Sequence, residues 1–60
     1  MKQPHTTLTI EEAIALTTDA LEKGMAPDMA HNALVLDGFT FERAEKIVAW
    51  ARVQAKKEAS

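Results

Sequence analysis

The sequence predicts an all-α fold: a compact three-helix bundle with a flexible N-terminal arm and an extended C-terminal helix. First, apolar residues recur at helical spacing in three segments. Second, the only two glycines, Gly24 and Gly38, separate these segments where helices are expected to end. Third, the alternating stretch at residues 7–10 is too short for a strand and has no partner segment. Three helices joined by short connections pack around one core.

The chain of 60 residues is long enough for one domain only. A chain of this length buries about 60% of the surface that its unfolded form exposes, so we expect a thin core and a stability of roughly 3–5 kcal/mol. Residues 1–8 contain Pro4 and no periodic pattern, which predicts a flexible arm. Residues 9–60 then form the single three-helix domain.

The first helix is expected at about residues 10–23. Thr9 followed by Glu12 is a capping box, in which each side chain accepts a hydrogen bond from the backbone N–H of the other residue. Gly24 suits the position just past the end of the helix, where φ is positive. At 100° per residue the segment has an apolar face and an acidic face. The apolar face contains Ile10, Ala13, Ile14, Thr17, Ala20 and Leu21, and the acidic face Glu11, Glu12, Asp19 and Glu22.

The second helix is expected at about residues 27–37. Pro27 is favoured in a first turn, where its missing N–H would have no partner, and Asp28 complements the helix dipole there. Small residues on two helices allow a close approach, which predicts that Ala33→Leu overpacks the contact and costs roughly 1–3 kcal/mol. The apolar side of this helix contains Met29, Ala30, Ala33, Leu34 and Leu36.

The third helix is expected at about residues 41–58, because Thr40 can cap it and no glycine or proline follows. Its predicted core stripe contains Phe41, Ala44, Val48, Ala51 and Ala55, with Ile47 at the edge. Trp50 lies about 120° from the centre of this stripe at 100° per residue. Three interpretations remain open: Trp50 covers the edge of a thin core beside solvated cations, it anchors a partner protein, or it contacts nucleic acid together with these cations. The residues around it are Arg43, Lys46, Gln54 and Lys57.

From Gly24 onward the chain resembles the ubiquitin-associated (UBA) domain family. The resemblance lies in "KGM" at residues 23–25, "AHNAL" at residues 30–34, Gly38, and "FERAEKIV" at residues 41–48. It covers about 40 of the 60 residues, counting the first helix. It implies a compact three-helix fold that binds ubiquitin or related protein partners. In this chain Met25 replaces the aromatic residue that is usual in the first loop.

The corner before the third helix also invites comparison with a DNA-binding helix–turn–helix. With Gly38 as the turn glycine, Asp37 falls where an apolar residue is needed and Leu34 where a small one is needed. The residues that open the third helix include Glu42 and Glu45, whose carboxylates would repel phosphates. The corner therefore fits this motif poorly.

Composition argues against several functional classes. The net charge is −2, with a balance of −4 over residues 1–39 and +2 over residues 40–60, so the chain lacks the basic excess typical of nucleic-acid-binding proteins. There is no cysteine, and His5 and His31 are far apart, so we expect no metal site and no cofactor. No catalytic motif or phosphate-binding loop is present, which predicts a protein that is not an enzyme and has no small-molecule substrate. Without a signal segment or an apolar run of membrane length, we expect a cytoplasmic protein.

The sequence therefore predicts a small protein-binding module or adaptor without catalytic residues, whose partner is another protein. Its candidate partner-binding residues are Met25, Ala26, Arg43, Lys46, Trp50 and Val53. One alternative is a regulatory protein that binds nucleic acid through the basic residues of the third helix, Arg43, Lys46, Arg52, Lys56 and Lys57. Another is an accessory or structural component of a larger assembly such as a phage particle.

Overall fold

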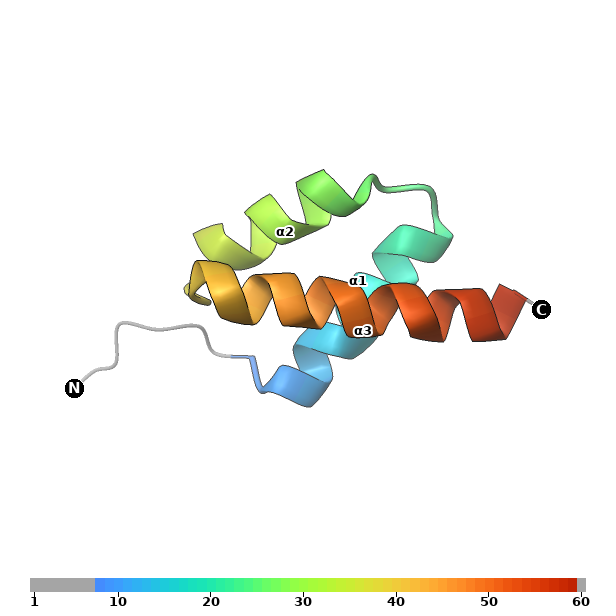
Figure 1. Ribbon diagram of the computed structural model, residues 1–60, viewed down its shortest axis with the longest axis horizontal. Helices are drawn as coiled ribbons and strands as arrows, with labels where there is room; N and C mark the ends of the chain where they lie inside the picture. The colour runs from blue at the N-terminus through green and yellow to red at the C-terminus, as the bar shows by residue number, and fades with distance from the viewer. Residues whose placement is uncertain (1–7, 60) are drawn as a thin grey trace.

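The computed structural model describes residues 8–59, with side chains to residue 57, and confirms the all-α three-helix bundle. Helices α1 (Ile10–Glu22), α2 (Pro27–Leu36) and α3 (Phe41–Ala59) begin and end within one residue of the predicted boundaries. In Figure 1, α2 runs beside α3, α1 crosses behind it, and the last turns of α3 extend past both. The predicted arm falls largely on residues 1–7, outside the described part, whereas Leu8 packs against the core.

The helix starts follow the local signals in the sequence. Glu12 N donates to Thr9 Oγ1 and Thr9 N donates to Glu12 Oε1, both at 3.0 Å, which completes the predicted capping box of α1. Pro27 occupies the first turn of α2. Arg43 N donates to Thr40 Oγ1 at 3.1 Å, so Thr40 caps α3 as expected.

Helices α1 and α2 end in the same way, with a glycine at positive φ. Gly24 has φ 103° and Gly38 has φ 119°, values that a residue with a Cβ rarely adopts. The residue after each glycine donates back into the helix, Met25 N to Ala20 O at 3.0 Å and Phe39 N to Leu34 O at 3.1 Å. This pattern is the Schellman motif, in which the residue after the glycine also packs on the last turn. In α2 the motif turns Phe39 back toward the core.

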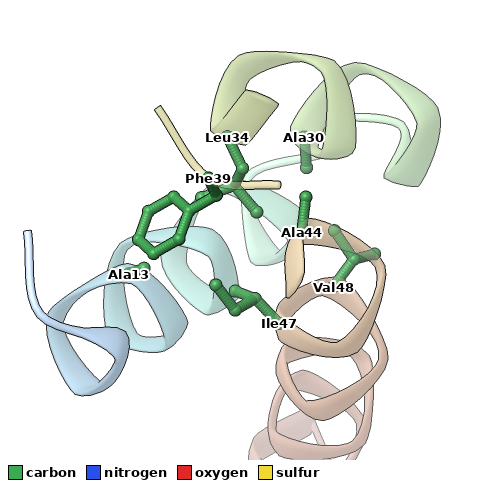
Figure 2. Packing of buried hydrophobic residues seen from close by; sticks show 7 residues of the cluster. All are labelled: Ala13, Ala30, Leu34, Phe39, Ala44, Ile47 and Val48. Carbon is green, nitrogen blue, oxygen red and sulfur yellow. The ribbon is translucent and has the colours of Figure 1, made fainter. Parts of the chain in front are cut away.

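The core lies where α3 crosses the other two helices, as Figure 2 shows. Ile47 is its largest fully buried side chain, and alanines on α2 and α3 allow those helices to approach closely. Phe39 reaches into the same cluster from the loop before α3 (Figure 2). The buried cluster contains Ala13, Ala30, Leu34, Phe39, Ala44, Ile47 and Val48.

Two expectations about packing are wrong. Phe41 was expected in the core, but its side chain is 66% exposed and its ring packs edge-on against His31, with the ring centroids 4.5 Å apart. Phe39 fills the core instead, so the buried stripe of α3 is centred further toward Ile47. Ala33 was expected in a tight helix contact but is exposed, and a leucine at this position would not overpack the core. Ala30 and Ala44 are the small residues at the contact between α2 and α3.

Candidate functional site

The candidate site is an open surface where α1 and α3 lie side by side. A hollow of about 520 Å³ lies between Gln54 of α3 and the outer side of α1. A second hollow of about 300 Å³ is lined by Ile14, Trp50, Val53 and Gln54. Because the two hollows share Ile14 and Gln54, they form one continuous surface. We call it the α1–α3 face and define it by these four residues together with Glu11, Asp19 and Glu22. The cations Arg43, Lys46 and Lys57 line neither of these two hollows, but they are exposed and helical spacing puts them on the same side of α3 as Trp50.

Large apolar side chains are exposed at the centre of this face. Trp50 is 53% exposed and Val53 is 54% exposed, beside the half-buried Ile14. Trp50 points away from the core because its position lies about 110° from the centre of the buried stripe of α3. The indole is therefore neither part of the buried cluster nor fully in solvent, as expected for a side chain that can anchor a partner.

Charge on the α1–α3 face is divided between the two helices. Glu11, Asp19 and Glu22 line it from α1. Arg43 and Lys46 are exposed on α3, seven and four residues before Trp50, which places both on the same side of the helix as the indole. The carboxylates of α1 thus form an acidic edge of this face, while on α3 the cations lie along the same side as Trp50, with the exposed Glu42 four residues before Lys46.

One carboxylate of the acidic edge already has a cation beside it. Lys23 Nζ lies 2.9 Å from Asp19 Oδ2, at the end of α1. The hydrogen bond to Asp19, reinforced by the attraction of its charge, raises the pKa of Lys23 above its usual value. Because both side chains are exposed, the pair contributes little to stability.

Met25 and Ala26 lie elsewhere. Met25 lines a separate apolar hollow of about 280 Å³ between α1 and α2, and the lining of that hollow does not include Trp50. Ala26 is exposed at the residue before α2. The six candidate binding residues are therefore distributed over two surfaces, and Ile14 and Gln54 are additional members of the Trp50 surface. The hollow between α1 and α2 is lined by Leu8, Leu16, Thr17, Ala20, Met25, Ala30, Ala33, Leu34 and Asp37.

The opposite side of α3 faces α2 and has a different character. Arg52 lines a hollow of about 510 Å³ there with Glu45, so it is separated from Arg43 and Lys46. Half-buried His31 lies in the same hollow, with its Nε2 3.1 Å from the carbonyl oxygen of Phe41. Helical spacing alone could not predict this contact, because it joins residues on either side of the turn at Gly38. The basic residues of α3 therefore do not form one continuous stripe.

Comparison with known proteins finds no family model, no curated protein and no solved structure that matches this chain. Within the described residues, no three histidine or acidic side chains are grouped closely enough to hold a metal ion. Across residues 8–59, no helix has both the length and the apolar character needed to cross a membrane.

Proposed function

We propose that this chain is a small non-enzymatic protein-binding module that acts through a UBA-like three-helix surface, with the α1–α3 face as its docking site. The observation that supports this most directly is the half-exposed Trp50, which shares an open hollow with Val53 and Ile14. Exposed aromatic residues flanked by arginine are the side chains that contribute most to binding at protein interfaces. The resemblance of residues 23–48 to UBA domains points to the same kind of role.

The charges of the face favour a protein partner over a nucleic acid. Arg43, Lys46 and the indole of Trp50 could bind phosphates and stack on bases. However, the carboxylates of Glu11, Asp19 and Glu22 line the adjoining hollow and would repel a polyphosphate backbone. A protein can place an apolar side chain on Trp50 and offer charges of both signs to the carboxylates of α1 and the cations of α3.

Affinity capture with single-residue variants tests the proposal. The immobilised protein is exposed to a nuclease-treated lysate of the organism that encodes it. The comparison includes Trp50→Ala and the control Leu36→Ala, which removes an exposed apolar side chain from α2, 79% exposed. We expect wild type and Leu36→Ala to retain the same protein. Trp50→Ala should bind that protein about 30-fold more weakly, equivalent to roughly 2 kcal/mol.

Circular dichroism must show that Trp50→Ala remains folded, as expected for a half-exposed side chain outside the buried cluster. Capture of the same protein by wild type and Trp50→Ala alike would refute the α1–α3 face as the docking site. Retention of nucleic acid before nuclease treatment, with binding that falls steeply as salt increases, would instead support the nucleic-acid alternative.

A further inference from the structure

We propose that the partner of this surface is an acidic amphipathic helix of another protein, which lies along the side of α3 that carries Trp50. This inference rests on the proposed function and names the chemistry of the partner. It is carried by the charge of the exposed side chains that share a side of α3 with the indole. We call them the Trp50 line, and they are Arg43, Lys46, Trp50, Gln54 and Lys57.

The Trp50 line has one sign of charge. At 100° per residue, its members lie within about 40° of Trp50, and within residues 41–57 no carboxylate of α3 falls in that sector. Arg43 and Lys46 precede the indole by two turns and one turn, and Lys57 follows it by two turns. From Arg43 to Lys57 the line is about 21 Å long at 1.5 Å per residue, which a partner helix of about 15 residues would cover.

The two cations before Trp50 have no carboxylate beside them. Among residues 8–57, no acidic side chain lies within ion-pair distance of Arg43 or Lys46, although Glu42 is four residues before Lys46. Trp50 and Val53 each expose more than half of their side chain next to these cations. A helix with apolar side chains at its centre and carboxylates one and two turns away is complementary to this arrangement.

Carboxylates on both sides of the Trp50 line favour a narrow partner over a broad anionic surface. Gln54 and Glu42 diverge from Trp50 in opposite directions around α3, by about 40° and 80°. Glu42 is exposed, and beyond Gln54 the adjoining hollow is lined by Glu11 of α1. A flat anionic membrane would meet these flanking carboxylates and be repelled, whereas a single helix can present its acidic side to the line and neutral side chains to both flanks.

Fluorescence anisotropy of labelled helical peptides with the purified full chain tests this inference at low salt. The acidic probe is a peptide of about 15 alanine and glutamine residues, with two central leucines three residues apart. It has glutamates four and seven residues before the first leucine and seven residues after it. Two matched probes replace the glutamates with glutamine or lysine. We expect wild type to bind the acidic probe about tenfold more tightly than the glutamine probe, and the lysine probe most weakly.

Charge reversal on and off the Trp50 line shows whether position matters. Lys46→Glu should bind the acidic probe about fivefold more weakly and should bind the lysine probe more tightly than wild type does. The matched control Arg52→Glu makes the same change of net charge in the hollow that faces α2, so it should bind the acidic probe like wild type. Both residues are exposed, and circular dichroism should show both variants folded.

Equal binding of the acidic and glutamine probes by wild type, or an equal loss in Lys46→Glu and Arg52→Glu, would overturn the inference. So would tighter binding of a single-stranded oligothymidine, or of phosphatidylserine vesicles, that Lys46→Glu abolishes, because the cations would then bind phosphate groups. If wild type does not prefer the acidic probe but capture from lysate still depends on Trp50, only the chemistry of the partner is wrong. If Trp50→Ala binds the acidic probe as tightly as wild type, the docking site of the proposed function fails as well.

Discussion

Phe39 and Phe41 lie two residues apart in the loop and first turn of α3, yet their environments are opposite. Phe39 is 9% exposed and belongs to the buried cluster, whereas Phe41 is 66% exposed and contacts His31. The cause is the Schellman motif at the end of α2, where the N–H of Phe39 returns to Leu34 O. The side chain that follows a helix-ending glycine is thereby directed onto the helix it leaves.

Substitution of the two phenylalanines tests this assignment. Removal of a buried phenylalanine ring costs about 3–5 kcal/mol, comparable to the whole stability of a domain of this size. We therefore expect Phe39→Ala to be largely unfolded at room temperature. Phe41→Ala loses only the contact of an exposed ring and should remain folded. Urea titration followed by circular dichroism measures both, and equal destabilisation by the two substitutions would contradict the core described above.

Helical periodicity explains why the sequence alone did not identify Phe39. Spacing arguments apply only to residues inside a helix, and Phe39 lies in the loop that precedes α3. Phe41 was assigned to the core because it continues the spacing of Ala44 and Val48 by one turn. The usable signal was the pair Gly38–Phe39, an apolar residue directly after a helix-ending glycine.

At the scale of elements, the helix boundaries follow from local chemistry that the sequence displays directly. Capping side chains, a proline in a first turn and glycines at helix ends act within a few residues, so no tertiary information is needed to recognise them. The side of α2 that becomes buried could not be predicted in the same way. Its apolar residues point in several directions, and only Ala30 and Leu34 become buried, because the packing of α1 and α3 selects which side of the helix is covered.

The cap of α1 makes a prediction about a single hydroxyl group. Thr9→Ala removes the acceptor for Glu12 N, and the reciprocal bond from Thr9 N alone cannot satisfy that donor. We expect a loss of about 0.5–2 kcal/mol in the free energy of unfolding. Thr9→Ser keeps the acceptor oxygen and should stay close to wild type. Thermal denaturation of the two variants distinguishes them, and identical melting curves for alanine and serine would show that the cap does not contribute.

At the scale of the whole molecule, hollows of different character lie between each pair of helices. The hollow between α1 and α2 is mainly apolar, the one between α2 and α3 contains His31 and Arg52, and the α1–α3 face combines apolar and charged groups. Helical spacing predicted which α3 residues share a side with Trp50, because all of these residues lie on one helix. It could not predict that Ile14 joins that side or that Met25 does not, since both depend on how the helices cross.

The fluorescence of Trp50, the only tryptophan in the chain, tests most directly whether this residue is available to a partner. In dilute protein, we expect emission near that of hydrated indole and ready quenching by acrylamide. Unfolding in urea should then increase the quenching only modestly, because 53% of the side chain is already exposed in the folded state. A blue-shifted emission that is protected from acrylamide in the folded monomer would place Trp50 in the core and contradict its role as the anchor of the α1–α3 face.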